Sequence, residues 1–337
     1  MGAQRPPPIR LVRLVTKALR PTVVIPLALS AAVLAALLAI SNPAQVVAVM
    51  QRVQYRYLLY IFGLTVAYEA LRCTQWSVLL RAMGIHVPVR TQVLSFLGGE
   101  VTETLPVGTY FRNYLLCRSE GTAFGLSSVA TTLSIVSEVF ICLAGLVILG
   151  LGAWSSWLRP IIVLGVAIFL VLVWAIRRSA DRVAAPRWLS GRVGFQRVVH
   201  ELEQFRTGAV ALWHPRVLVV QSTLGALYLI VGGAALYLVV QGLGISHVTV
   251  WQALAVYFFS LAFHLISPTS MDIGVIELGG VAALVAVGVA EASAVGAMLI
   301  YRVLRIGFPL AIALVGLAIL HDELRAALRE TSDQVGA

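Results

Sequence analysis

The part of the chain that decides the fold is residues 217–271, which read VLVVQSTLGALYLIVGGAALYLVVQGLGISHVTVWQALAVYFFSLAFHLISPTSM. This run contains no formally charged side chain, and it is too long for one membrane helix, which needs about 20 apolar residues. Gly242 and Gly244 divide the run. It therefore predicts a membrane span over residues 217–241 and a second apolar helix over residues 250–266.

The composition extends this conclusion to the whole chain of 337 residues. Hydrophobic residues make up 59% and charged residues 12%, whereas soluble domains carry roughly 25% charged residues. So few charges cannot cover a water-soluble particle of this size, which excludes a soluble domain and a disordered chain. The three cysteines share no metal-ligand spacing, so they are interpreted as core residues and no metal site is expected. The sequence predicts an all-α polytopic membrane protein.

The net charge of +10 is concentrated in two segments. Residues 1–20 contain five basic and no acidic residues, and residues 177–216 contain eight arginines against three acids. Because cytoplasmic loops of membrane proteins are enriched in basic residues, both segments are expected on the cytoplasmic side of a bacterial inner membrane. The N-terminus is then cytoplasmic, and the positive charge indicates topology and not nucleic-acid binding.

The remaining apolar segments predict further helices over residues 22–40, 55–81, 121–158, 160–176 and 293–320. Residues 192–212 carry apolar side chains at helical spacing with charges between them, which predicts an amphipathic helix on the cytoplasmic surface. The expected organisation is a basic tail (1–20), a first membrane half (21–177), a cytoplasmic linker helix (178–214), a second membrane half (215–320) and a C-terminal tail (321–337).

Two segments, residues 91–117 and 250–290, combine apolar character with helix breaks and acids. A helix that enters the bilayer, breaks and returns tolerates such residues where protein or water covers its backbone, so residues 91–117 are interpreted as re-entrant and residues 250–290 as a second broken segment. Pro106 and Pro268 are 162 residues apart, as are the preceding spans. The basic segments place the first break on the cytoplasmic side and the second on the outer side. Together with the offset, this predicts two inverted repeats, an architecture found in carrier proteins. The breaks are expected to act as alternating gates, marked by Pro106, Gly108, Pro268 and Gly274.

Charged side chains inside the apolar segments identify a candidate site, because each costs about 2.5–3.5 kcal/mol at the bilayer centre unless it pairs or lines a wet cavity. The candidates for substrate binding are Glu100, Glu103, Arg112, Glu138, Asp272, Glu277, Arg302 and Arg305. Arg112 and Arg302 are expected to hold a phosphate, which guanidinium groups and free helix-end N–H groups suit. Glu138, Asp272 and Glu277 are expected to pair with the arginines in the empty site and could carry protons.

Three other polar residues, a pair and a single histidine, have a structural interpretation beside a functional one. Glu69 and Arg72 are three residues apart on one predicted helix and could simply neutralise each other. His264 lies on an apolar helix before the second break, where a core histidine is the first interpretation and a proton relay the second. These groups are therefore kept apart from the candidate site.

Known catalytic and nucleotide-binding motifs do not occur in this sequence. It contains no H-E-x-x-H, no G-x-S-x-G, no Walker A motif and no paired Asp-rich motif for magnesium and prenyl diphosphate. The single lysine, Lys17, lies in the N-terminal tail, which excludes an intramembrane lysine nucleophile. We expect no enzyme activity and no cofactor. Two alternatives remain open: an intramembrane enzyme with a carboxylate base acting on a lipid-linked substrate, and a non-transporting scaffold of the cell envelope.

The motifs at the two breaks can be compared with known families. The first reads PVGTYFR at residues 106–112, and the second reads SPTS at residues 267–270 followed by GVIE at residues 274–277. With Tyr301-Arg302 and Pro309 in the last span, they resemble the transmembrane-domain family of lysylphosphatidylglycerol synthase, the flippase-like half of the multiple peptide resistance factor. The resemblance covers roughly residues 20–320. Thr109 stands where that family usually has glutamate, so Glu100 or Glu103 would have to supply the charge.

The resemblance implies an integral membrane protein with two inverted repeats that translocates lipid. It also implies that this sequence lacks the soluble aminoacyl-transferase domain of the synthase, so lysyl-lipid synthesis is not expected. The predicted function is a flippase or transporter that moves an anionic lipid, a phospholipid or polyprenyl phosphate, through a central polar cavity. The expected partners are this lipid and the membrane, but no nucleic acid. A homo-oligomer or an envelope enzyme is left open as a further partner.

Overall fold

A computed structural model describes residues 43–51, 53–103, 108–153, 167, 193–212, 214–266 and 274–319. Their helices are α3 (Pro43–Met50), α4 (Tyr55–Ala82), α5 (Val89–Thr102), the 3-10 turn η1 (Gly108–Tyr110), α6 (Phe111–Glu120), α7 (Phe124–Ala153), α9 (Val193–Leu212), α10 (Pro215–Gly242), α11 (Val250–Ile266), α12 (Val275–Ala286) and α13 (Glu291–Ile319). The predicted spans over 22–40 and 160–176 and both predicted tails lie outside the described residues, as do Pro106, Pro268 and Asp272.

Three of the described helices contain stretches long and apolar enough to cross a membrane: Phe124–Leu149, Pro215–Gly242 and Glu291–Gly316. Their mean hydropathy lies between 1.8 and 2.3, because almost every position carries an aliphatic or aromatic side chain or a small residue. In the described part of the chain the regular structure is helical. The predicted all-α membrane protein is confirmed, and the described boundaries of the predicted helices agree to within a few residues.

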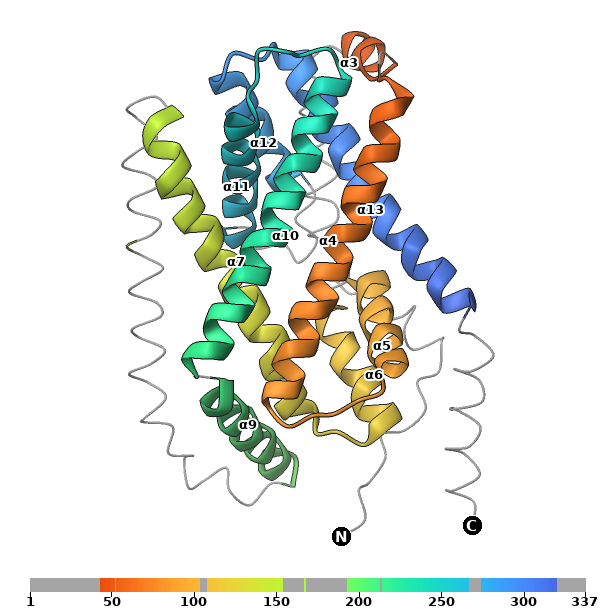
Figure 1. Ribbon diagram of the computed structural model, residues 1–337, viewed down its shortest axis with the longest axis vertical. Coiled ribbons are helices and arrows are strands. Elements are labelled where there is room, and N and C mark those ends of the chain that lie inside the picture. Colours follow the sequence, from red (N-terminus) through yellow and green to blue (C-terminus); the bar gives the residue numbers. More distant parts are fainter. Residues whose placement is uncertain are drawn as a thin grey trace.

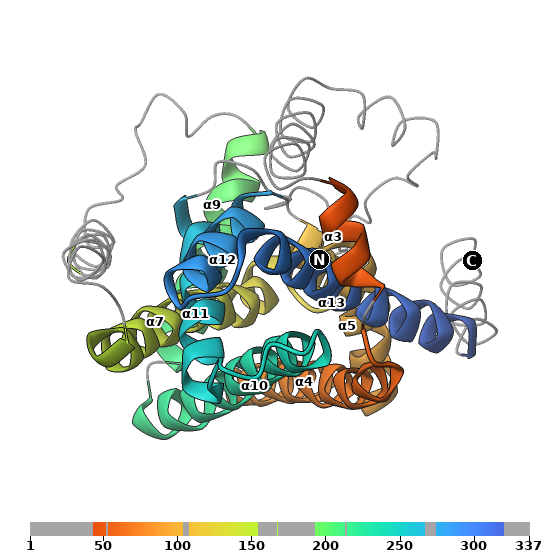
Figure 2. The ribbon, with the colours of Figure 1, turned by 90° about the horizontal axis from the view of Figure 1, so that it is seen from above.

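The centre of the bundle is the pair α4 and α10, which lie side by side over their whole length (Figures 1 and 2). They run in opposite directions, since α4 begins at the end of the bundle where α10 ends (Figure 1). Polar groups join them towards the C-terminal end of α4 and the N-terminal end of α10, where the Gln75 amide donates to the Gln221 carbonyl at 2.9 Å. Both glutamines are buried, so this bond satisfies groups that would otherwise be costly.

The two halves share several details of local structure. Helices α4 and α10 both have 28 residues, and both end in the same turn. After α4, Gly84 takes a φ of 77° and the Ile85 N–H donates to the Leu80 carbonyl; after α10, Gly244 takes a φ of 79° and Ile245 donates to Val240. Only glycine takes such a φ without strain, which explains the residue at both positions.

The helices that follow the shared turns also correspond in order and length. Each half continues with two short helices, α5 and α6 or α11 and α12, and ends with a long one, α7 with 30 residues or α13 with 29. The short pairs occupy opposite ends of the bundle (Figure 1). Two inverted repeats would have this order of helices, and the repeats and re-entrant hairpins stay a prediction.

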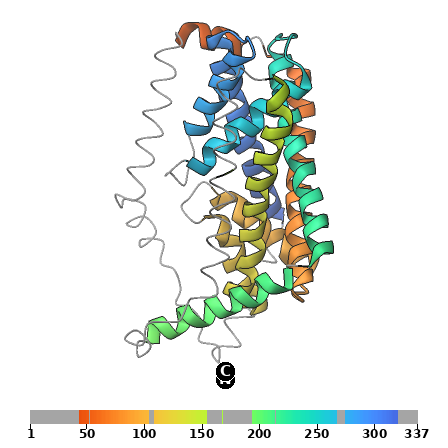
Figure 3. The ribbon, with the colours of Figure 1, turned by 90° about the vertical axis from the view of Figure 1, so that its left-hand side faces the viewer.

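Helix α9 lies across one end of the bundle, transverse to the long helices (Figure 3). It occupies the range predicted for the amphipathic linker helix. Glu201 of α9 accepts a hydrogen bond of 2.5 Å from the Gly125 N–H in the first turn of α7. A carboxylate at this place satisfies a free N–H group and opposes the positive end of the helix dipole. The linker is thereby fastened to the first half.

Candidate functional site

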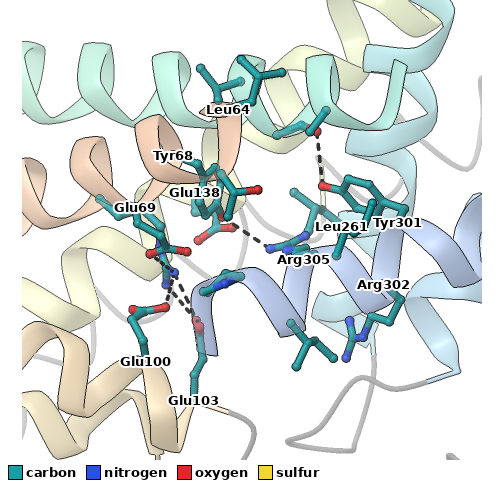
Figure 4. A pocket seen from close by; sticks show the side chains of 18 of the residues that line it. Leu64, Tyr68, Glu69, Glu100, Glu103, Glu138, Leu261, Tyr301, Arg302 and Arg305 are labelled. Atoms are coloured by element: carbon teal, nitrogen blue, oxygen red, sulfur yellow. Dashed lines mark hydrogen bonds and ion pairs between the residues drawn. The ribbon is translucent and has the colours of Figure 1, made fainter. Parts of the chain in front are cut away.

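A cavity of about 330 Å³ lies inside the bundle, between both halves of the chain (Figure 4). Its walls come from α4, α5, α7, α10, α11, α12 and α13. Seven of its lining side chains carry a formal charge: Glu69, Arg72, Glu100, Glu103, Glu138, Arg302 and Arg305. Aliphatic residues of α4 and α13 also line the cavity, so charged and apolar side chains share its wall.

Arg72 of α4 is the hub of the charges on the α5 side of the cavity. Its two terminal nitrogens donate to Glu100 and Glu103, each at 2.8 Å, and a longer contact of 3.4 Å reaches Glu69. Glu69 and Glu100 are buried, whereas the Glu103 side chain is 41% exposed. A carboxylate removed from water is unfavourable unless it keeps a cationic partner. Arg72 is that partner for both buried glutamates.

Arg112 of α6 closes the same cluster from the other side. Its Nη2 lies 3.2 Å from Glu100, its Nε donates to the Thr109 carbonyl, and its guanidinium stacks 4.8 Å from the Phe96 ring centre. Arg112 does not line the larger cavity. It lines a smaller polar chamber of about 20 Å³ beside it, which is enough for one water molecule.

On the opposite wall, Arg302 of α13 lies 3.1 Å from the carboxylate of Glu277 in α12. This is a charge pair and not a directed hydrogen bond. The second oxygen of Glu277 accepts from the Gly274 N–H at 2.5 Å. Gly274 has a φ of 91°, which a side chain would strain, and this explains the glycine of the G-x-x-E motif. Glu277 is only 1% exposed, whereas Arg302 reaches the cavity.

Arg305, one turn further along α13, is surrounded by tyrosines. Its guanidinium carbon lies 5.9 Å from the ring centre of Tyr68 and 5.8 Å from that of Tyr257, and its Nη2 donates to the Tyr68 hydroxyl at 3.4 Å. Tyr301 is fixed nearby by a hydrogen bond to the Gly232 carbonyl (Figure 4). Among the described residues, the buried Nη1 of Arg305 has no hydrogen-bond partner. A buried guanidinium with a free donor is suited to bind an oxyanion.

The break between α5 and α6 depends on Gly108. The Thr102 hydroxyl, at the end of α5, lies within hydrogen-bond distance of the carbonyls of Gly98, Gly99 and Gly108, so it ties the two sides of the break together. A Cβ placed on Gly108 would collide with the backbone carbonyl of Thr102. The backbone therefore approaches itself too closely for any other residue.

Replacing Gly108 by alanine is expected to destabilise the fold by about 1–3 kcal/mol, because neighbouring backbone has to move. The matched control is Gly307→Ala in α13, where a Cβ meets nothing within 4 Å. Thermal unfolding of detergent-purified variants measures the difference. A Gly108→Ala variant that unfolds at the temperature of the control would show that this close approach carries no strain.

The cavity brings together most of the residues that the sequence singled out. Glu100, Glu103, Glu138, Arg302 and Arg305 line it, and Arg112 and Glu277 lie directly behind the lining through their ion pairs. Asp272, Pro106 and Pro268 cannot be placed because they lie outside the described residues. Groups of three or more metal-binding side chains do not occur among the described positions.

Sequence reasoning missed two features of the site. Arg72 was interpreted as a partner of Glu69 alone, yet its shorter contacts reach α5. The tyrosines around Arg305, namely Tyr68, Tyr257 and Tyr301, come from three helices and share no sequence motif. No local pattern could have identified them as a group, since only the packing of the helices brings them to one arginine.

Comparison with known protein families gives one match. The family model described as "Lysylphosphatidylglycerol synthase TM region" matches residues 23–313 of the chain. The matched range includes both helix breaks and every side chain of the cavity. Among curated proteins, none matches the chain.

Proposed function

The chain belongs to the lysylphosphatidylglycerol synthase TM-region family, as its motifs predict, and from this premise we propose that it is a lipid flippase. Family membership and the apolar spans make it a multi-pass membrane protein concerned with lipid. The proposed substrate is a lipid with an anionic phosphate head, and the proposed membrane is the bacterial inner membrane with the N-terminus in the cytoplasm. The two halves, related as inverted repeats with re-entrant hairpins, would alternately open the cavity to each side.

One observation carries this proposal: Arg302 and Arg305 both line a cavity inside a membrane-spanning bundle, and Arg305 keeps a buried donor without a partner among the described residues. A buried donor that makes no hydrogen bond lowers the stability of the protein by about 1–3 kcal/mol. A phosphate oxygen would complete it. Arg112 is assigned a supporting role, because it holds Glu100 and faces the smaller chamber.

The size of the cavity fits a lipid head and not a whole lipid. A volume of about 330 Å³ lies at the lower end of the range for small-molecule pockets. The acyl or prenyl tail must therefore stay in the bilayer while the head passes through the protein. Leu310 of α13 lines the cavity and is also 36% exposed, so the cavity reaches the bundle surface beside α13. At this place the polar head can lie in the cavity while the apolar tail stays in the hydrocarbon of the bilayer.

Reconstituted protein tests the proposal. Vesicles containing a trace of NBD-labelled phosphatidylglycerol are treated with dithionite, which bleaches only the outer leaflet. Wild-type protein is expected to move labelled lipid from the inner to the outer leaflet, so that dithionite bleaches this label as well. Arg305→Gln is expected to slow this exposure by roughly tenfold or more, since a charge-assisted hydrogen bond contributes about 1.5–3 kcal/mol.

The control is Arg206→Gln on the exposed surface of α9, which removes the same charge away from the cavity. Labelled phosphatidylcholine in parallel vesicles reports whether the head must be anionic. Bleaching no faster than in protein-free vesicles would refute the flippase. Equal rates for wild type and Arg305→Gln would remove Arg305 from the binding site.

A further inference from the structure

Glu138 differs from every other carboxylate at the cavity. It is the single charged residue of α7, whose apolar stretch has a mean hydropathy of 2.3. Glu69, Glu100, Glu103 and Glu277 each form an ion pair with an arginine, whereas Glu138 forms none with the described residues. An ionisable side chain in such a helix is costly and marks a pathway for substrate or ions.

Titratable and charged groups surround Glu138 from several helices. Nearest in the cavity and chamber are Tyr68 and Arg72 of α4, Arg112 of α6, Tyr228 of α10, Tyr257 of α11 and Arg305 of α13, with Cys142 on its own helix. Glu69, Glu100, Glu103 and Arg302 line the same cavity. Figure 4 shows Glu138 beside Tyr68, on the side of the cavity that Arg305 approaches. Arg305 is the nearby cation that is not already paired with a carboxylate of the described residues.

Glu138 also lies in the wall between two spaces. It lines both the cavity of about 330 Å³ and the polar chamber of about 20 Å³. The other side chains of the chamber include Gln75, Thr131 and Ser134, which can hold a water molecule by hydrogen bonds. Glu138 therefore faces, besides the cavity, a small polar space that a lipid head is too large to enter.

We propose that Glu138 binds a proton together with the lipid phosphate and so couples lipid movement to the proton gradient across the membrane. This inference rests on the proposed flippase function. With the cavity empty, Arg305 is the cation near Glu138 that balances a negative charge there. Once a phosphate occupies Arg305, Glu138 loses this compensation and faces an added negative charge, so it takes up a proton. By linkage, proton binding strengthens phosphate binding to the same extent.

The charges balance in this scheme. The phosphodiester brings one negative charge, and the proton that converts the Glu138 carboxylate to the acid brings one positive charge. The loaded cavity then has the same net charge as the empty one. The electrostatic free energy of switching between the two proposed conformations, open to either side of the membrane, is therefore similar with and without lipid. Movement is an electroneutral symport of one proton with one lipid anion, and a proton gradient with the outside acidic drives the lipid inward.

A pH gradient across reconstituted vesicles tests the coupling. The vesicles carry labelled phosphatidylglycerol in their membrane and the pH dye pyranine in their lumen. With the outside more acidic, wild-type protein is expected to shift label to the inner leaflet and to acidify the lumen. One proton per lipid limits the shift to about tenfold per pH unit. A potassium diffusion potential alone is expected to have no effect.

Glu138→Gln is expected to lose both the shift of label and the acidification, and any remaining exchange should not depend on the pH gradient. The matched control is Glu203→Gln on the exposed side of α9, which should keep both responses. Glu138→Asp, which keeps the carboxylate, should retain lumen acidification and serves if the glutamine variant does not fold. Its failure to acidify the lumen would count against the proposal.

The outcomes separate this inference from the function on which it rests. Wild-type protein that exchanges no lipid refutes the flippase itself. Wild-type protein that exchanges lipid equally with and without the pH gradient, and leaves the lumen pH unchanged, overturns the role of Glu138 while the flippase stands. A shift of label driven by a sodium gradient and not by protons would overturn it as well.

Discussion

Replacing Arg72 by methionine is expected to destabilise the protein by about 3–5 kcal/mol, which is the cost of removing one partner from a buried ion pair. Three carboxylates, those of Glu69, Glu100 and Glu103, contact this guanidinium. Without it, Arg112 alone remains near them, and it reaches only Glu100. Methionine has a similar length and preserves packing, so the loss measures charge. Thermal unfolding in detergent gives the magnitude.

A second substitution distinguishes charge from packing in the same cluster. Arg72→Met combined with Glu103→Gln removes one excess carboxylate and is expected to recover part of the lost stability. Arg81→Met, at an exposed position of the same helix, is the control for the substitution itself. If Arg72→Met unfolds at the same temperature as Arg81→Met, the cluster is not what holds α5 against α4.

Replacing Arg302 by methionine is expected to have an effect of similar size, again several kcal/mol, for a different reason. Its partner Glu277 is 1% exposed and is held in place by the Gly274 N–H, so it cannot turn towards water. The first turn of α12 would then contain a buried negative charge whose arginine partner is lost. Unfolding temperatures of the purified variants again report the change.

The double variant Arg302→Met with Glu277→Gln separates the two roles of this arginine. Glutamine keeps the oxygen that caps α12 but carries no charge, so stability is expected to return. Lipid exchange is not expected to return, because the cavity has lost one of the two arginines that we propose bind the phosphate. A double variant that folds and exchanges labelled phosphatidylglycerol at the wild-type rate would show that Arg302 has only a structural role.

The sequence predicted the helices well because their signals are local. Apolar length and glycine turns placed the span over 217–241 and the helix over 250–266, and the structure has Pro215–Gly242 and Val250–Ile266. Gly274 was identified through the break and the motif that contains it, and the structure adds the reason for a glycine there, a φ of 91°. These features depend on neighbours within one or two turns.

The pairing of charges could be predicted only in part. The spacing of Glu69 and Arg72 indicated a contact within one helix, and this contact exists at 3.4 Å. The shorter contacts of Arg72 join residues 28 and 31 positions apart, and they depend on how α5 packs against α4. The same limit applies to Arg305, whose contact with Tyr68 spans 237 positions. No periodicity within a segment encodes such distances.

The turn shared by α4 and α10 has a consequence for how the molecule changes shape. If the two halves are the inverted repeats proposed above, each half could adopt the backbone path of the other. Exchanging these paths would generate a second conformation related to the first by a two-fold rotation, with the glycine turns at Gly84 and Gly244 as pivots. The difference between the halves in one conformation would then describe the displacement that leads to the next.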